Sequence, residues 1–281
     1  MSEISVIVTG GASGIGLANV RKLAGKWLAV KTHISILDIN TQQGEQIVNS
    51  LKNEFSSSGH TTFTFHRCDV ASWDSLAEAF TDIFTVQRRI DIVFANAGVA
   101  EKGAFMEPSN KPTKPNMLCC DINFYGVLNT VNLAIHYMNK NQISTRNGLR
   151  GSIICTASNS GLYAFPLEPM YAAAKHGVVG LVRSLGPRLA QGKIQINGLA
   201  PCVVETNIAP GVGQLDGIIL TPLSTVVKAV EMILDDASIS GQIAEISEDR
   251  VTWPKQQDYV DDSTRKNYGI LCTLVEGATS A

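Results

Sequence analysis

Short runs of apolar and β-branched residues recur along the chain, and longer segments with apolar residues at helical spacing separate them. The first run, Ile4 to Val8, has the composition of a strand that is buried on both faces. About seven strands are predicted, at residues 4–8, 33–37, 61–66, 90–94, 151–155, 193–197 and 241–246. Because helical segments alternate with these strands, we expect an α/β fold with a doubly wound parallel sheet and helices on both faces.

A single domain is expected over residues 1–247. No linker rich in proline, glycine or serine divides this stretch, and its composition does not change abruptly. The polar residues 248–281 show no clear pattern, so we expect a C-terminal tail without chemistry of its own. In doubly wound sheets, ligands bind at the carboxyl ends of the strands. Asp38, Asp69 and Asn96 all follow predicted strands and could therefore line one crevice.

A glycine-rich turn follows the first strand directly. Thr9 to Gly16 have the sequence T-G-G-A-S-G-I-G, and a helical pattern continues from Leu17. In this context, backbone N–H groups can approach a pyrophosphate at the positive end of a helix. The G-x-x-x-G-x-G spacing differs from the commoner G-x-G-x-x-G, and an ordinary glycine-rich turn is the alternative. We predict a nucleotide-binding turn formed by Gly10, Ser13, Gly14, Ile15 and Gly16.

Asp38 ends the second predicted strand, 22 residues after Gly16. A carboxylate in this place can accept hydrogen bonds from both hydroxyls of an adenosine ribose, and it would repel the 2′-phosphate of NADP. Neither Ser13 nor Ile39 supplies a compensating cation. The expected cofactor is therefore NAD. Asp38 could also, or instead, cap the helix that is predicted to begin near Thr41.

Tyr171 and Lys175 lie four residues apart, which places them one turn apart on the same face of a helix. A free tyrosine has a pKa near ~10 and is a poor base at neutral pH. A nearby ammonium, together with a cationic nicotinamide ring, could lower the pKa of the phenol toward about 7. Such a tyrosine could take a proton from an alcohol or return it. The spacing alone is weak evidence, since a half-buried tyrosine beside a solvated lysine is common.

Ser158 follows the fifth predicted strand and precedes Tyr171 by 13 residues. Its hydroxyl could hydrogen-bond a substrate oxygen and hold it against the tyrosine. A serine that only shapes a turn is the alternative. Ser160 is a rival for the role, and the spacing to Gly161 and Tyr171 favours Ser158. The sequence contains no G-x-S-x-G motif, which forms the nucleophile turn of serine hydrolases, so a serine hydrolase is not predicted.

The bulk properties narrow the class of partner. Hydrophobic residues make up 44% of the 281 residues, charged residues 17%, and the net charge is −2. Since there is no basic run, neither nucleic acid nor an anionic membrane is a predicted partner. No signal-peptide pattern and no run of about 18 apolar residues are present, so we expect a cytoplasmic protein. The cysteines and histidines lack ligand spacing, and no metal site is predicted.

With the glycine-rich turn, Asp38, Ser158 and the Tyr171–Lys175 pair in this order, the chain resembles the short-chain dehydrogenase/reductase family over residues 4–247. It is most similar to fungal relatives of NAD-dependent 15-hydroxyprostaglandin dehydrogenase, including members of terpenoid and polyketide pathways. The resemblance implies a Rossmann-type fold and an NAD-dependent oxidoreductase that interconverts a secondary alcohol and a ketone. It also implies a homodimer or homotetramer, paired through the helices that hold Asn123 and Tyr171.

The resemblance also implies roles for individual residues. Tyr171 would be the general acid/base, and Ser158 would orient the substrate oxygen. Lys175 would bind the nicotinamide ribose and lower the pKa of the tyrosine, and Asn123 would hold a water in the proton relay to Lys175. The further cofactor contacts would be Asp38, Asp69, the backbone of Val70, Asn96, Val204 and, at the nicotinamide carboxamide, Thr206. One departure is Cys202, which follows Pro201 where the family usually has glycine.

Substrate clues are few. Nine residues are expected near the substrate pocket. One of them, Glu168, is charged, and the other eight are apolar: Leu162, Phe165, Pro166, Leu167, Met170, Val203, Val204 and Ile208. This composition favours a lipophilic alcohol or ketone, although the same residues could serve plain packing. Three alternatives stay open: a reductase that uses NADPH, a nucleotide-binding protein without turnover, and a non-redox rearrangement on the same fold.

Overall fold

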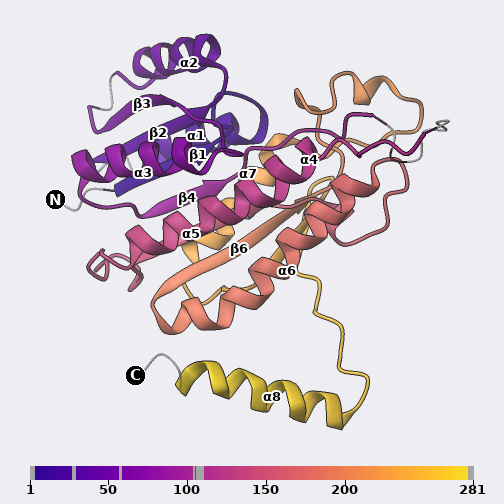
Figure 1. Ribbon diagram of the computed structural model, residues 1–281. Coiled ribbons are helices and arrows are strands. Elements are labelled where there is room, and N and C mark those ends of the chain that lie inside the picture. Colours follow the sequence, from indigo (N-terminus) through magenta and orange to yellow (C-terminus); the bar gives the residue numbers. More distant parts are fainter. Residues whose placement is uncertain (1–3, 27–29, 57–58, 104, 106–110, 278–281) are drawn as a thin grey trace.

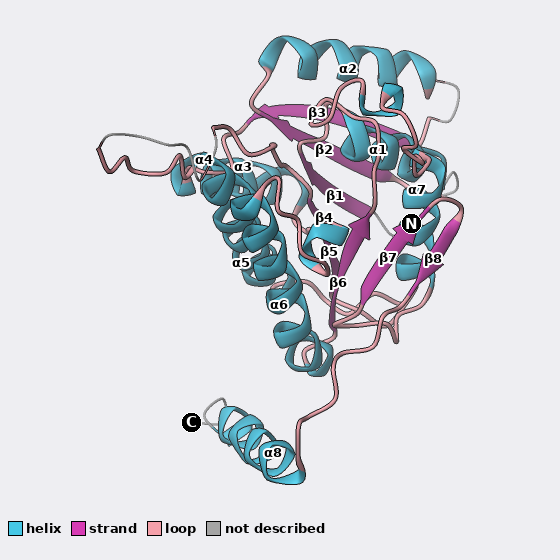
Figure 2. Ribbon diagram, turned by 90° about the vertical axis from the view of Figure 1, so that its right-hand side faces the viewer, coloured by secondary structure: helices cyan, strands magenta, loops and turns pink. Residues whose placement is uncertain are grey.

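The computed structural model describes residues 4–26, 30–56, 59–103, 105 and 111–277. Within these ranges the chain forms a sheet with helices on both faces (Figures 1 and 2). The first three residues of the predicted domain and the last four of the predicted tail lie outside the described residues. The predicted α/β architecture is confirmed.

The sheet has eight strands in the order β3-β2-β1-β4-β5-β6-β7-β8. Their bounds are Ile4–Thr9 for β1, Thr32–Asp38 for β2, Thr61–Arg67 for β3, Ile92–Ala95 for β4, Gly151–Thr156 for β5, Ile194–Pro201 for β6, Ile243–Ser247 for β7 and Arg250–Thr252 for β8. β1 to β7 are parallel, and β8 pairs antiparallel with β7. The prediction of about seven strands missed β8, because three residues are too short to show a strand pattern.

Alternate residues of the central strands face two separate hydrophobic cores. Ile7 of β1 packs with the helices of one face, whereas its neighbours Val6 and Val8 pack with the helices of the other. The first face carries α3 (Trp73–Gln87), α5 (Val127–Met138) and α6 (Pro169–Gln191). The second carries α1 (Gly14–Lys26), α2 (Thr41–Glu54) and α7 (Leu223–Asp235). The period-two alternation of a strand therefore explains why both faces of these apolar runs are covered.

The winding of the chain reverses between β1 and β4, which are neighbours in the sheet. Such a switch point leaves a crevice beyond the carboxyl ends of the two strands, where ligands bind in doubly wound sheets. The glycine-rich turn follows β1, and Asn96 follows β4. The topology thus brings two of the predicted site segments to one place.

The predicted helix over residues 116–139 is interrupted. α4 (Leu118–Cys120) passes into a π-helical turn, η1 (Asp121–Gly126), before α5 begins. Gly126 packs closely against Val70, which lies in the loop after β3. A Cβ at Gly126 would lie 2.8 Å from Cγ2 of Val70. The helical run Leu118–Met138 has a mean hydropathy of 1.2, so length and composition alone would permit a membrane span. Its buried residues pack in the core beside the sheet, as expected for a core helix.

The predicted C-terminal tail contains a helix that the sequence pattern did not predict. A connecting stretch after β8 leads to α8 (Asp262–Gly277), which lies apart from the body of the sheet in both ribbon views (Figures 1 and 2). The rings of Tyr259 and Tyr268 lie 5.6 Å apart and join the connecting stretch to α8. The apolar residues of α8 form one short stripe among polar residues, and this hydrophobic periodicity is too weak to predict a helix.

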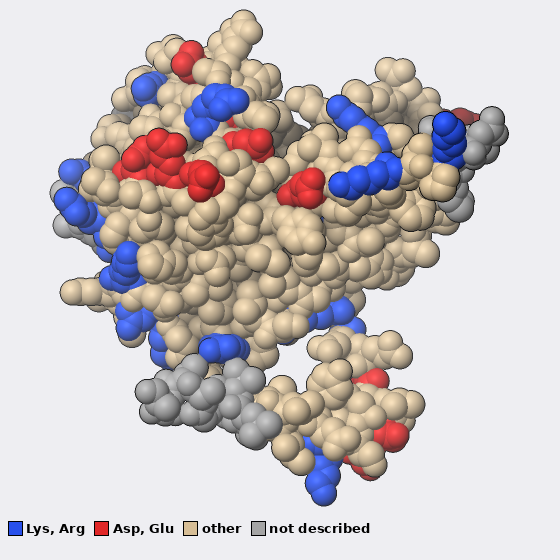
Figure 3. All heavy atoms as spheres, viewed as in Figure 1, with Lys and Arg blue, Asp and Glu red and all other residues tan. Residues whose placement is uncertain are grey.

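Charged side chains are dispersed over the face shown in Figure 3, and a group of acidic ones gathers over α3. This helix carries Asp74, Glu78 and Asp82, all of which are exposed. Glu78 is exposed in the middle of α3, so its substitution serves as a control for substituting a half-buried carboxylate elsewhere in the protein.

Candidate active site

Close backbone approach shapes the glycine-rich turn. Gly10 has a φ of +62°, and a Cβ at Gly10 would lie 2.9 Å from the Cα of Ala97. A Cβ at Gly16 would lie 2.3 Å from the carbonyl oxygen of Gly10 and 2.7 Å from Nδ2 of Asn96. α1 begins at Gly14 within the same turn. The turn therefore leads directly into a helix N-terminus, which is the arrangement that suits a pyrophosphate.

Asp38 lies beside this turn and is held by it. One carboxylate oxygen of Asp38 accepts a hydrogen bond from the backbone N–H of Ala12 at 3.2 Å, and the other accepts from Asn40 at 3.1 Å. The cap of α2 is Asn40 and not Asp38, because Oδ1 of Asn40 accepts from the backbone N–H of Gln43. The alternative role of Asp38 as a helix cap was therefore wrong, and its carboxylate stays next to the predicted nucleotide turn.

Asn96 ties together the ends of three strands. Its side-chain amide donates to the carbonyl of Thr9 at 3.0 Å, and its Oδ1 accepts from the hydroxyl of Thr156 at 3.0 Å. The hydroxyl of Thr9 in turn accepts from the backbone N–H groups of Asn96 and Ala97. Sequence reasoning did not single out Thr9 or Thr156. Their position at the ends of β1 and β5 is the signal that could have found them.

Asp69 and Val70 do not line the cavity that lies between the glycine-rich turn and the start of α6. Asp69 accepts a hydrogen bond from the backbone N–H of Ala71 at 3.0 Å, which stabilises the turn after β3. The side chain of Val70 is buried against Gly126. Their predicted contacts with an adenine would therefore be made at the edge of the site, through the carboxylate of Asp69 and the backbone of Val70.

A cavity of about 760 Å³ joins the glycine turn to the start of α6. Predicted residues from five separate segments of the chain contribute to its wall: Gly10, Ser13, Gly14, Ile15, Asn96, Ser158, Tyr171, Lys175, Val204 and Thr206. Gly16, Asp38 and Asn123 do not line the cavity. The carboxyl ends of the strands thus gather most of the predicted set around one space.

Lys175 is buried and Tyr171 is half-buried, and burial shifts the pKa of both side chains. Burial raises the pKa of Tyr171 to about 12, a hydrogen bond with Ser158 lowers it, and the carboxylate of Glu168 raises it. Burial also lowers the pKa of Lys175 to about 8. The Nζ of Lys175 donates to the carbonyl of Thr156 at 2.8 Å and lies 5.5 Å from the centre of the Tyr171 ring. The chain by itself therefore keeps Tyr171 protonated at neutral pH, and the expected lowering by Lys175 together with a bound nicotinamide stays a prediction.

Asn123 is buried in η1 and holds the segment after β4. Its Oδ1 accepts from the backbone N–H of Val99 at 2.8 Å, and its Nδ2 donates to the carbonyl of Val99 at 2.8 Å. The same Nδ2 lies 3.1 Å from Sγ of Cys119. Val99 lines the cavity, so Asn123 positions one of its walls. The predicted water relay through Asn123 stays a prediction.

The outer part of the cavity is mostly apolar. Of the residues expected there, five line it: Phe165, Glu168, Val203, Val204 and Ile208. Leu162, Pro166, Leu167 and Met170 do not line it, and Leu167 is 83% exposed. Sequence reasoning missed Tyr163 and Lys102, which also contribute to the wall.

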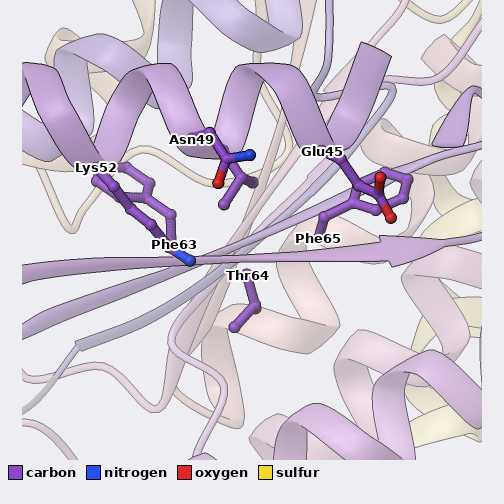
Figure 4. A pocket seen from close by; sticks show the side chains of 7 residues that line it. Glu45, Asn49, Lys52, Phe63, Thr64 and Phe65 are labelled. Carbon is purple, nitrogen blue, oxygen red and sulfur yellow. The ribbon is translucent and has the colours of Figure 1, made fainter. Parts of the chain in front are cut away.

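A second depression, of about 400 Å³, lies between α2 and β3 (Figure 4). Glu45, Asn49 and Lys52 of α2 stand over Phe63, Thr64 and Phe65 of β3. It contains no predicted site residue and lies at the edge strand of the sheet. The cavity at the switch point is therefore the candidate active site.

Comparison with known proteins identifies the family. Residues 5–215 match the family described as short chain dehydrogenase. The chain belongs to this family. It is 33% identical over 208 residues to the short-chain dehydrogenase/reductase prx7 of Penicillium rubens, a match that covers 71% of this chain and 68% of that protein. Across four such fungal relatives, the matched stretch covers between 56% and 68% of the relative's own length.

Two further likenesses bear on the activity of this short-chain dehydrogenase. It is 34% identical over 220 residues to 5′-hydroxyaverantin dehydrogenase of Dothistroma septosporum, covering 73% of this chain and 69% of that protein. The crystal structure of levodione reductase superposes with a TM-score of 0.72 at 25% identity, covering 87% of this chain and 96% of that one. The family therefore makes the protein an oxidoreductase that acts on CH–OH groups with a nicotinamide cofactor.

Substituting Gly16 with alanine is expected to weaken nucleotide binding at least tenfold and to destabilise the fold by about 1–3 kcal/mol, because the added Cβ overpacks the turn against the Gly10 carbonyl. The control is Gly180→Ala in α6, where a Cβ meets nothing within 4 Å. That change should raise stability by about 0.5–1 kcal/mol, as glycine is unfavourable inside a helix. Urea unfolding and a fluorescence titration with NADH measure both effects. Unaltered NADH affinity in Gly16→Ala would contradict the assigned turn.

Proposed function

We propose that this short-chain dehydrogenase interconverts a secondary alcohol and a ketone on a lipophilic molecule and uses NAD. The observation that carries the proposal is the joint presence of Ser158, Tyr171 and Lys175 in a cavity that begins at the glycine turn. A bound nicotinamide would accept the hydride from the carbinol carbon, or supply it in the reverse direction.

The side chains of this protein divide the remaining work. Ser158 orients the substrate oxygen, and Tyr171 exchanges the proton with it. In the direction of reduction, a neutral Tyr171 donates its proton to the ketone oxygen, and the high pKa of Tyr171 keeps it ready to do so. In the direction of oxidation, Tyr171 must first lose its proton. The ammonium of Lys175, whose pKa is about 8, favours that anionic state from one helical turn away.

The proposal for NAD over NADP rests on Asp38. Its carboxylate is held against the N–H of Ala12 in the glycine turn, so a 2′-phosphate on the adenosine ribose would meet a fixed negative charge. Asp38 is half-buried, and its hydrogen bonds leave it little freedom to swing away.

The wild-type protein is expected to bind NADH at least tenfold more tightly than NADPH, and Asp38→Ala should narrow that ratio to about threefold or less, because the like-charge repulsion of roughly 1–2 kcal/mol is removed. Tryptophan-quenching titrations with both nucleotides measure it. Asp74→Ala on the exposed face of α3 is the control and should leave the ratio unchanged. Tighter NADPH binding by the wild type would overturn the role of Asp38 and make the protein a reductase of the NADPH type.

The proposal for a lipophilic substrate is supported by the apolar outer wall of the cavity, formed by residues such as Phe165, Val203 and Ile208. Burial of apolar substrate area against this wall provides affinity, whereas Tyr171 and Ser158 select the position of the reacting oxygen. We further infer that the substrate is a terpenoid or polyketide intermediate and that the protein is a cytoplasmic homodimer or homotetramer. The family resemblance supports the substrate class and the assembly.

A further inference from the structure

The first turn of α6 is capped by a residue far away in the sequence. α6 begins at Pro169, which has no N–H, so the backbone N–H groups of Met170 and Tyr171 are the ones without a partner inside the helix. Oε2 of Glu101 accepts from both, at 2.9 and 3.1 Å. Ala172 already bonds to the carbonyl of Glu168. The carboxylate of Glu101 therefore completes the hydrogen bonding at the start of the helix.

The contact is reciprocal. The backbone N–H of Glu101 donates to Oε2 of Glu168 at 3.3 Å, and Glu168 is the residue that precedes α6. The side chain of Glu168 makes no capping hydrogen bond to its own helix. A serine or aspartate in its place would cap α6 locally. The chain instead uses a carboxylate 70 residues away from Tyr171, which joins two walls of the cavity.

The segment that carries Glu101 is held at its other end by Asn123. Val99 and Ala100 line the cavity, and the backbone N–H and carbonyl of Val99 each bond to the side chain of Asn123. This wall is therefore held at two points that are two residues apart: Asn123 of η1 holds Val99, and the start of α6 holds Glu101. Tyr171 itself donates one of the hydrogen bonds to Glu101, through its backbone N–H.

We propose that Glu101 is a positioning residue of the reaction: it fastens the cavity wall formed by Val99 and Ala100 to the start of α6 and so fixes Tyr171 relative to the substrate. The inference rests on the proposed function, because Tyr171 is taken as the acid/base. It assigns to Glu101 a role beyond capping, since a cap alone would not require a residue from the opposite wall.

Three variants separate positioning from capping. Glu101→Ala removes the link, and we expect kcat to fall about tenfold, because misplaced reacting groups lose rate steeply. Glu101→Gln keeps an acceptor oxygen and should retain kcat within about threefold of wild type. Glu101→Ala with Glu168→Ser supplies a local cap, which should restore the thermal midpoint and leave kcat about tenfold low. Glu78→Ala on α3 is the control. Recovery of kcat in the double variant, or an unchanged kcat in Glu101→Ala, would overturn the proposal.

Amide hydrogen exchange tests the link without turnover. In Glu101→Ala, peptides covering residues 97–103 and 169–173 should both exchange faster than in wild type and in Glu78→Ala. Faster exchange confined to 169–173 would reduce Glu101 to a cap and overturn the proposal. NADH affinity should stay within about twofold of wild type, because Glu101 lies at the substrate end of the cavity. A wild type that binds no nicotinamide nucleotide would instead refute the proposed function, and the exchange result would still decide the role of Glu101.

Discussion

Replacing Tyr171 with phenylalanine is expected to lower kcat by about 10³-fold, within the usual range for removing a general acid/base. The hydroxyl group is the only part of the side chain that is lost, and the phenyl ring still fills the same half-buried space. The hydrogen bond with Ser158 disappears, but the glycine turn and Asp38 are untouched. The affinity for NADH should therefore change by less than about threefold, since the lost group acts on the reacting oxygen.

Steady-state kinetics in the ketone-reduction direction, combined with the NADH titration, measures this effect. Tyr125→Phe is a matched control, because Tyr125 is 53% exposed on η1 and its hydroxyl has no place in the proposed reaction. The control should keep wild-type kinetics. A Tyr171→Phe protein that retains more than about a tenth of the wild-type kcat would remove the tyrosine from the acid/base role.

Replacing Lys175 with methionine is expected to lower kcat by about 100-fold or more without lowering the stability of the fold at pH 7. Lys175 is 3% exposed, and burial lowers its pKa to about 8. A buried ammonium costs folding free energy, and methionine fills a similar volume without that cost. The activity falls because the phenolate of Tyr171 loses its nearest cation and the cofactor ribose loses a donor.

The pH dependence of stability gives this prediction a second measurement. A lysine whose folded pKa is about 8, below its usual 10.5, binds fewer protons in the folded state between these values. The wild type should therefore gain stability as the pH rises from about 8 to 10, and Lys175→Met should lack this gain. Urea unfolding at pH 7 and pH 9.5 measures it. If the free energy of unfolding changed equally with pH in both proteins, the pKa of Lys175 would not be lowered by folding, which would contradict this prediction.

The strands and the Tyr171–Lys175 pair could be predicted because local patterns encode them. Residues such as Val6 to Val8 are apolar on both faces, and a four-residue spacing fixes the face of a helix. The turn Gly10–Gly16 was recognisable because backbone packing that excludes any Cβ allows only glycine at Gly16. The family comparison confirms the predicted fold and class of enzyme.

Contacts between distant segments could not be predicted. Glu101 caps α6 from 70 residues away, and no local pattern marks that partnership. The π-helical turn around Asn123 depends on how Val70 and Gly126 pack, which is a tertiary effect. Spacing also could not show that burial, which outweighs the hydrogen bond with Ser158, raises the pKa of Tyr171 in the chain by itself. Spacing reveals which groups are neighbours, whereas burial decides which charge state they hold.

The most direct test of the central claim follows a hydride. Wild type and Tyr171→Phe are each incubated with NADH deuterated at C4 of the nicotinamide and with a panel of lipophilic ketones that includes acetophenone, 2-octanone and a decalone. Mass spectrometry of the products locates the label. We predict that the wild type forms a secondary alcohol with one deuterium on the carbinol carbon, and that Tyr171→Phe forms far less of it. Tight NADH binding without labelled alcohol from any ketone would contradict the account and assign the cavity to nucleotide binding without redox turnover.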